Sequence, residues 1–332
     1  MYSLRHARRA LESPHLTARE LNRLYHTRGH RRTNPDGIDV FAEDWDNLLI
    51  LDSCRYDMFE ECHTLPGRLE SRRSKGSHTS EFLQANVTGR DLRDTVYVTA
   101  SPMYYRNRDD LDARFHEVVE VWKEGGWHKQ YRTVTPGSVV EYATGANDRY
   151  PDKRLLVHFL QPHYPFIGET GLERFDLDSL AFEWDAVADG EVDVSDRTLR
   201  RAFRENLEIA LPHVERLMRT LPGRTVVSAD HGQVIGDRSW PLPIREYGHP
   251  DGTYIDALVK VPWLVFENGP RKTVRHGDAD GEVGRNDGPA VGRESADSAE
   301  ASPEAQAAQD DERENESEED LVEQRLESLG YL

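Results

Sequence analysis

The strongest constraint on the fold is a regular alternation of short apolar runs and longer amphipathic stretches between residues 46 and 268. The apolar runs are bounded by turn residues and predict strands at Asn47–Leu51, Thr95–Ala100, Leu155–Leu160, Thr225–Ala229 and Val261–Phe266. The intervening stretches predict helices at Tyr56–Cys62, Ser80–Asn86, Leu111–Trp122, Ser138–Asn147 and Leu199–Leu221. Such an alternation is typical of an α/β fold with a mostly parallel sheet and helices on both faces.

Composition divides the rest of the chain. Residues 1–45 predict a helical extension, in which Pro14 stands at the first position of an amphipathic helix. Residues 46–270 carry the α/β pattern, whereas residues 271–320 are acidic, rich in Gly, Ala and Ser and poor in large apolar side chains, which predicts a disordered linker. In residues 321–332, leucines recur at near-helical spacing, and we expect a short helix that docks back on the domain.

The net charge of −19 argues against nucleic-acid binding, which needs a basic surface for the phosphates. Only six of the 42 basic residues are lysines, and an acidic chain poor in lysine is typical of a haloarchaeal cytosol, where net charge preserves solubility. There is no secretory signal or membrane-spanning apolar run, and two cysteines form no disulfide framework, so we expect a cytoplasmic protein. The basic N-terminal helices suggest either peripheral contact with an anionic membrane or, as we favour, packing on the domain edge.

Polar side chains follow three of the predicted strands at the point where each strand ends. Asp52 follows the first strand, His163 follows the third, and Asp230 and His231 follow the fourth. Each has an ordinary structural interpretation: Asp52 as a helix cap, Asp230–Gly232 as a turn, and His163 as a rigid loop residue between prolines. Because ligands bind at the carboxyl ends of strands in open α/β sheets, their convergence favours a divalent cation site, occupied by Ca, Mg, Mn or Zn.

A bound cation leaves open positions for an anionic ester, and the attacking group should then lie where a loop enters a helix. The segment Gly76–Leu83 fits, because it combines a glycine turn with three hydroxyls at the start of a predicted helix. Hydroxyls at this position are usually helix caps, and spacing alone does not choose among Ser77, Thr79 and Ser80.

Taken in order, the motifs resemble those of the sulfatase branch of the alkaline phosphatase superfamily. The resemblance rests on Asp52, Arg55 and Asp57, then VHFLQPHYPF at 157–166, SADHG at 228–232, His249 before the strand with Val-Pro, and the terminal Leu-Gly-Tyr. The family pattern has a closing Leu-Thr-Gly nine to ten residues after its nucleophile, and Val87-Thr88-Gly89 is similar. The resemblance therefore implies an alkaline phosphatase-like fold in a haloarchaeal sulfatase-like protein.

The resemblance also implies the roles of the site residues. Thr79 would be nucleophile and metal ligand, with Ser77 as runner-up, and Asp52, Asp230 and His231 would complete the metal site. His163 and His249 would hold the ester oxygens or a second metal, and His158 would line the same pocket. Cys54 is taken as structural, and the insertion 168–195 as shaping the substrate pocket.

The chain departs from the family pattern in two places. The nucleophile segment lacks the Pro and Arg of sulfatases, and a threonine cannot become formylglycine; the second Asp of the family's first motif is Ser53 here. The implied activity is hydrolysis of small-molecule or glycan sulfate or phosphate esters through a hydroxyl nucleophile. The alternatives are a transferase of a phosphoryl-linked group or sulfate acting on glycans or lipids, and a catalytically silent binding protein.

Overall fold

The central feature of the computed structural model is a seven-stranded sheet in the order β2-β11-β8-β1-β7-β3-β4. The structure describes residues 14–29, 31–175, 184–188, 191–277 and 318–329. The strands of this sheet are β1 (Asn47–Leu51), β2 (Arg68–Arg73), β3 (Asp91–Thr99), β4 (Arg114–Glu120), β7 (Arg154–Phe159), β8 (Gly223–Ser228) and β11 (Lys260–Asn268). The five strands from β8 to β4 are parallel, and β11 pairs antiparallel with both β8 and β2.

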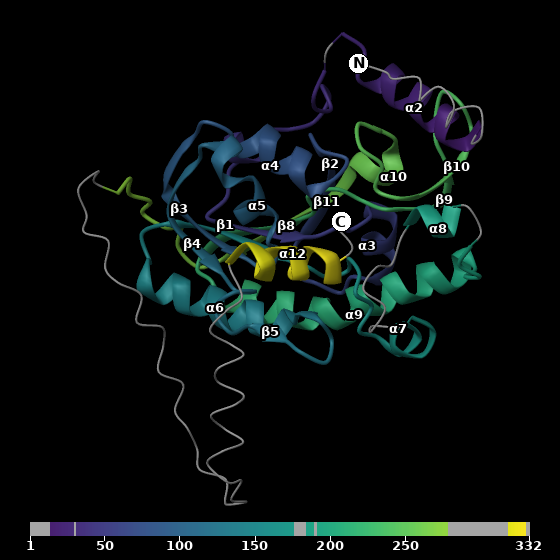
Figure 1. The fold of residues 1–332 in the computed structure, drawn as a ribbon. Coiled ribbons are helices and arrows are strands. Elements are labelled where there is room, and N and C mark those ends of the chain that lie inside the picture. Colours follow the sequence, from purple (N-terminus) through teal and green to yellow (C-terminus); the bar gives the residue numbers. More distant parts are fainter. Residues whose placement is uncertain (1–13, 30, 176–183, 189–190, 278–317, 330–332) are drawn as a thin grey trace, which may run out of the picture.

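Helices cover both faces of this sheet, which confirms the predicted fold class. Figure 1 shows α4 (Thr79–Val87) and α5 (Met103–Leu111) on one side and α6 (Pro136–Arg149) and α9 (Asp196–Thr220) on the other. β1 is buried at all five positions because it lies at the centre of the sheet, between β8 and β7. Its carboxyl end therefore opens into the interior of the molecule.

Smaller elements complete the fold. The remaining strands are β5 (Trp127–His128), β6 (Thr133–Val134), β9 (Val234–Arg238) and β10 (Arg245–Gly248), which form the two hairpins β5–β6 and β9–β10. The remaining helices of the described residues are α2 (Pro14–His26), η1 (Val40–Ala42), α3 (Tyr56–Cys62), α7 (Glu169–Arg174), α8 (Trp184–Ala188), α10 (Asp256–Val259) and α12 (Glu318–Ser328). Within the described residues, no helix has the length and apolar character needed to cross a membrane.

One predicted helix is wrong. The stretch Leu111–Trp122 forms the edge strand β4, which begins at Arg114 and pairs in parallel with β3. Leu111, Phe115, Val118 and Trp122 fit the spacing of a helix face, but β-branched Val118 and Val119 suit a pleated strand and pairing with β3 decides the outcome.

Both ends of the described chain contact the α/β body. The α2 helix begins at Pro14, as predicted, and hydrogen-bonds the β9–β10 hairpin through Asn22 and His26. The predicted acidic linker falls mostly outside the described residues, but its first residues are bonded to the body, since Lys272 donates to the carbonyl of Lys153. The four-part domain division stays a prediction.

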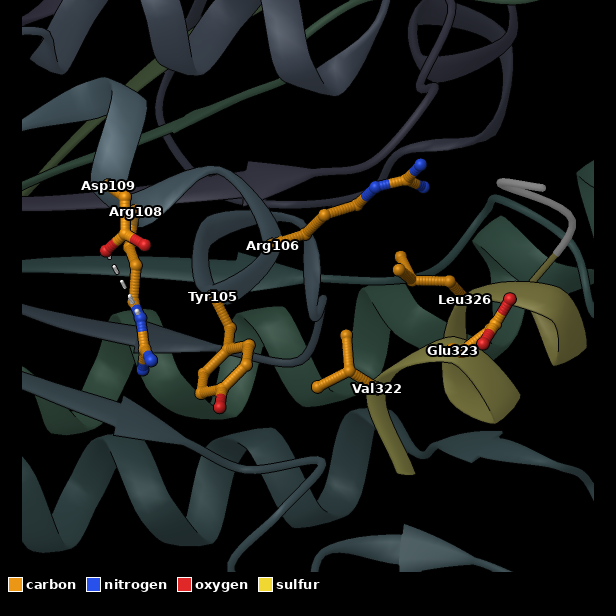
Figure 2. A pocket seen from close by; sticks show the side chains of 7 residues that line it. All are labelled: Tyr105, Arg106, Arg108, Asp109, Val322, Glu323 and Leu326. Atoms are coloured by element: carbon orange, nitrogen blue, oxygen red, sulfur yellow. Dashed lines mark ion pairs between the residues drawn. The ribbon is translucent and has the colours of Figure 1, made fainter. Parts of the chain in front are cut away.

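The C-terminal helix α12 begins three residues before the predicted position, and Val322, Leu326 and Leu329 are buried in the main core. A cavity of about 320 Å³ lies between α5 and α12 (Figure 2). Its lining consists of Tyr105, Arg106, Arg108, Asp109, Val322, Glu323 and Leu326. None of the predicted site residues lines this cavity.

Candidate metal and nucleophile site

Asp52, Asp230 and His231 meet at the carboxyl ends of β1 and β8. All three side chains are fully buried, and their ligand atoms lie within 4.8 Å of one another. Nε2 of His231 is 3.5 Å from Asp52 Oδ1 and 3.4 Å from Asp230 Oδ2. The structure thus brings together the three residues that the sequence analysis assigned to one cation.

The donor set fits a divalent cation. Nδ1 of His231 lies 2.7 Å from the carbonyl oxygen of Gly232, which can only accept, so Nδ1 donates and Nε2 is the ring nitrogen that faces the two carboxylates and could coordinate a cation. Two buried carboxylates next to such a nitrogen are costly unless a positive charge compensates them. Asp and His side chains arranged in this way would hold Zn, Mn or Mg.

The Thr79 hydroxyl lies directly against this group. It is the first residue of α4, and its Oγ1 donates to Asp230 Oδ2 at 2.9 Å and lies 3.3 Å from His231 Nε2. A helix N-terminus carries unpaired amides and a positive dipole end, so the same place favours a tetrahedral anion. The position combines a hydroxyl, a candidate cation site and an anion-binding helix end.

Ser77, the runner-up, has a different environment. Its hydroxyl and its backbone amide both donate to Glu81 Oε2, at 2.9 and 2.7 Å. This pattern resembles a capping box, in which a glutamate in the first helical turn satisfies donors that precede the helix. Burial raises the pKa of Glu81. Ser77 therefore stabilises the start of α4 through Glu81.

Two glycines allow the loops that carry Thr79 and His231 to pack closely against neighbouring backbone. A Cβ on Gly76 would lie 2.4 Å from the backbone nitrogen of Phe82, in the first turns of α4. A Cβ on Gly232 would lie 2.2 Å from the carbonyl oxygen of Ala257. Neither contact can relax by moving a side chain, so the loops that carry Thr79 and His231 require glycine at these two positions.

His163 and His249 form a second group beside the first. Their Nε2 atoms are 3.3 Å apart, and the rings of His249 and His231 are 5.0 Å apart. Burial lowers the pKa of His163 to about 4, and burial together with the nearby imidazoles of His231 and His163 holds the pKa of His249 well below its usual value. These two imidazoles are therefore neutral near pH 7. Nδ1 of His163 donates to the Tyr164 carbonyl at 2.6 Å, so its Nε2 carries a lone pair and could bind a cation, while His249 Nε2 could donate to an ester oxygen.

His158 lies on β7 behind the carboxylates. Its Nε2 is 3.6 Å from Asp230 Oδ2 and makes no hydrogen bond within the described part of the chain, while Nδ1 bonds the Tyr97 hydroxyl at 3.0 Å. Burial opposes protonation, but the Asp230 carboxylate raises the pKa of His158 above its ordinary value. Asp230 itself is buried, and the adjacent His231, His158 and Thr79 hold its pKa below the usual range.

Two residues that support the site were not found from the sequence. The Ser53 amide donates to Asp230 Oδ1 at 3.1 Å and its hydroxyl donates to Asp52 Oδ1 at 3.0 Å, from a left-handed backbone with φ of 60°. Asn206, fully buried in α9, donates to the carbonyls of His163 and Pro165 and accepts from the Ile167 amide. A serine at the family's Asp position gave a signal for the first residue, but nothing local in the sequence marks the second.

A rim of polar side chains lies next to this site. His78, the residue before Thr79, bonds Asp251 at 3.1 Å, and with Glu81 these residues form a second group whose ligand atoms lie within 4.8 Å. Asp251 is exposed and follows His249 by two residues.

The predicted insertion 168–195 is described only in part, since residues 176–183 and 189–190 lie outside the described residues. Within the described part, Trp184 lies against Gly248, next to His249.

No protein-family model matches the chain, and a search of curated proteins also finds no match. Solved structures with some likeness include the zinc complex of the C-terminal periplasmic domain of EcEptC from Escherichia coli, at 15% identity and a TM-score of 0.43, covering 67% of this chain and 72% of that one. Phosphonate monoester hydrolase SpPMH from Silicibacter pomeroyi has 15% identity and a TM-score of 0.39, with 68% of each chain covered. A protein in the alkaline phosphatase superfamily from Vibrio parahaemolyticus has 12% identity and a TM-score of 0.40, covering 77% of this chain and 70% of that one. Similarity at this level does not indicate a function for this chain. The proposal below is therefore based on the geometry of the site.

Proposed function

We propose that this chain is a metal-dependent hydrolase of phosphate esters, of the alkaline phosphatase type, with Thr79 as its nucleophile. One observation carries the proposal: the Thr79 hydroxyl, at a helix N-terminus, lies 2.9 Å from Asp230 and 3.3 Å from His231, within a fully buried group of possible metal ligands. A role for Thr79 as a helix cap is less well supported, because its hydroxyl contacts residues 151 and 152 positions away in the chain and not the amides of α4.

In the proposed reaction, Thr79 Oγ1 forms a bond to phosphorus and the bond from phosphorus to the leaving alcohol oxygen breaks. The threonine proton departs along the hydrogen bond that Oγ1 already makes to Asp230 Oδ2 and passes to the oxygen of the departing alcohol, so that the alcohol leaves neutral. A cation held by Asp52, Asp230 and His231 would lower the pKa of the hydroxyl and offset charge on the phosphoryl oxygens. Water then attacks the phosphothreonine, which releases phosphate and restores the hydroxyl.

His163 and His249 would lie next to the phosphoryl oxygens. In a neutral His163, Nδ1 donates to the Tyr164 carbonyl and Nε2 can only accept, so His249 is the imidazole that could donate to an ester oxygen from Nε2. The α4 N-terminus supplies further donors. Preorganised donors aimed at oxygens where charge develops are the main source of such rate enhancement.

Phosphate is favoured over sulfate because Thr79 cannot form the aldehyde that the sulfatase pattern uses. The experiment is a panel of nitrophenyl phosphate, bis-nitrophenyl phosphate and nitrophenyl sulfate, offered to the protein loaded with Zn, Mn or Mg. Turnover of a phosphate ester that is lost in Thr79→Ala supports the proposal. Faster turnover of nitrophenyl sulfate than of the phosphate esters would show that the substrates are sulfate esters. Metal binding without turnover of any ester would favour a catalytically silent binding protein.

A transferase differs from the hydrolase in the group that attacks the phosphothreonine. In a transferase, an acceptor hydroxyl would attack in place of water and take up the phosphoryl-linked group. Mass spectrometry of products formed with and without an added glycan or glycerol acceptor decides between them. Hydrolysis that is unaffected by the acceptor supports the hydrolase.

A further inference from the structure

The α2 helix lies beside the β9–β10 hairpin at one end of the molecule (Figure 1), and several large apolar side chains of α2 and of the turn between β9 and β10 are exposed. The exposed fractions are 51% for Leu21, 44% for Leu24, 56% for Trp240 and 37% for Leu242. On α2, Leu21, Leu24 and Tyr25 fall at helical spacings of three and four residues, so they share one side of the helix. The Trp240 ring meets the Tyr25 ring edge-on at 4.8 Å. We call these five residues the α2 patch.

Hydrogen bonds from the buried Asn22 side chain and from His26 hold the α2 patch in this arrangement. The Asn22 side chain is 1% exposed; it donates to the Leu242 carbonyl at 2.9 Å and accepts from the Leu242 amide at 2.7 Å. The His26 ring bonds the Trp240 carbonyl at 2.8 Å. The turn is thus fastened to α2 through its backbone, and this leaves its large apolar side chains facing solvent. Contiguous exposed apolar side chains in a fixed arrangement mark an interaction surface.

The charge around the α2 patch is opposite to that of the chain as a whole. The described residues between 14 and 32 include five arginines and one glutamate, whereas the whole chain has a net charge of −19. The Arg28 guanidinium lies 4.0 Å from the Tyr25 ring centre, and Arg31 and Arg32 are exposed just beyond α2. Glu20, the only acidic residue of α2, is paired with Arg23 at 2.7 Å.

We propose that the α2 patch binds an anionic lipid surface. Trp and Tyr beside leucines and a border of arginines match the layers of such a surface, with apolar groups entering below the headgroups and guanidinium groups bonding phosphates. The acidic remainder of the chain is repelled by the same surface, so the charge distribution favours one orientation. A protein partner would not require this separation of charge.

The α2 patch adjoins the candidate site through one loop. Gly252 packs against Thr27, since a Cβ there would lie 2.8 Å from the Thr27 methyl carbon, and the Tyr254 ring lies 5.9 Å from the His26 ring. The same loop carries His249 and carries Asp251, which bonds His78 beside Thr79. Binding at the α2 patch would therefore bring the rim of the site close to the lipid headgroups. The membrane proposal does not depend on the proposed function, because its test measures binding alone.

The test is flotation of the full chain with vesicles of phosphatidylcholine alone and of phosphatidylcholine mixed with phosphatidylglycerol. We expect binding to the mixed vesicles only, weakened by added salt. The double variant Leu21→Ser, Trp240→Ser should reduce binding on the order of tenfold because it removes apolar contact area. Arg31→Glu and Arg32→Glu should each reduce it by roughly fivefold or more.

The matched control is Leu172→Ser on α7, since Leu172 is 47% exposed but does not belong to the α2 patch. This variant should bind vesicles like the natural chain, and circular dichroism should show that all variants keep their fold. The proposal is overturned if the natural chain binds neither kind of vesicle, or if the α2 patch variants bind the mixed vesicles as well as the natural chain does. If light scattering shows a dimer that Leu21→Ser, Trp240→Ser converts to a monomer while vesicle binding is absent, the α2 patch is an interface between two copies and the proposal is wrong.

Discussion

The hydroxyl of Thr79 donates to the carboxylate of Asp230 at 2.9 Å, although 151 positions separate the two residues in the chain. This contact joins the start of a helix on one face of the sheet to the end of a central strand. The neighbouring hydroxyl of Ser77 makes its bond within its own helix start, to Glu81. Thr79 is therefore the candidate nucleophile, whereas the Ser77 hydroxyl stabilises the start of α4 through Glu81.

Replacement of Thr79 should therefore abolish turnover, and replacement of Ser77 should not. Thr79→Ala is expected to lower kcat by roughly a thousandfold or more, with Thr79→Ser retaining part of the activity because it keeps the hydroxyl. Ser77→Ala should cost about 1 kcal/mol in free energy of unfolding, because it removes one hydrogen bond to the buried Glu81 carboxylate. Phosphate-ester kinetics and urea unfolding measure both, and a Ser77→Ala enzyme that is stable but inactive would transfer the role to Ser77.

Metal binding should depend on Asp52. We expect Asp52→Asn to weaken binding of Zn or Mn on the order of a hundredfold or more, measured by calorimetry and by metal analysis of the purified protein. Asp57→Asn is the matched control, because Asp57 pairs with Arg55 at 2.6 Å outside the cluster. Chelation should remove turnover and lower Tm, because a ligand that binds only the native state stabilises it. Equal metal content in both variants would contradict the proposed cation site.

Ser53 should tune the cation site without being a ligand. Ser53→Ala and Ser53→Gly both remove the hydroxyl bond to Asp52 but keep the amide that bonds Asp230. Both should weaken metal affinity by about tenfold, the usual effect of losing a residue that orients a ligand. Because φ is 60° at this position, the glycine variant should unfold with a free energy about 0.5–1 kcal/mol higher than the alanine variant. Metal titration and urea unfolding separate the two effects.

Asn206 should couple α9 to the loop that carries His163. Asn206→Ala leaves the carbonyls of His163 and Pro165 and the amide of Ile167 without this partner. We expect a loss of about 2–4 kcal/mol in free energy of unfolding and a lower kcat, since each buried group left unpaired costs on the order of 1 kcal/mol. The control on the same helix is the exposed Glu208, where Glu208→Ala should change stability by less than about 0.5 kcal/mol.

The C-terminal helix should contribute to stability through its buried side. Leu326 is 2% exposed in the main core, so Leu326→Ala should lower the free energy of unfolding by about 2–3 kcal/mol. Glu323→Ala, on the exposed side of the same helix, should leave it nearly unchanged. Equal urea midpoints for the two variants would show that α12 does not pack on the domain in solution.

The accuracy of the sequence predictions follows the degree of burial. β1 and α3 match their predicted bounds, because the apolar run of β1 is buried throughout and turn residues mark its end. β2 was not predicted, because the sequence RLESRR is mostly charged and becomes a strand only by pairing with β11 at the sheet edge. The interpretation of 111–122 as a helix failed for a similar reason at the opposite edge.

The candidate site was predictable where residues follow strands directly. Asp52, Asp230 and His231 stand at strand ends, and topology alone brings them together. The proximity of His163 to His249 could be expected only from the resemblance, since His163 lies in the loop after β7 and His249 follows the β9–β10 hairpin, which is outside the main sheet. The sequence suggested membrane contact of the N-terminal helices only as the less favoured alternative, and it gave no sign that Trp240 and Leu242 join α2, because Trp240 reaches Tyr25 only through the bonds of Asn22 and His26 to the turn backbone. Roles in catalysis stay predictions until they are measured.

The short segment from Ser74 to Thr79 hydrogen-bonds Asp230 at two places. The Ser74 hydroxyl donates to its backbone carbonyl, and the Thr79 hydroxyl donates to its side chain. One inserted residue between these two anchors would displace the second by up to about 3.8 Å, further than any hydrogen bond can stretch. The spacing of five positions from Ser74 to Thr79 should therefore be invariant wherever this arrangement is inherited, while the length of the outer loops can drift.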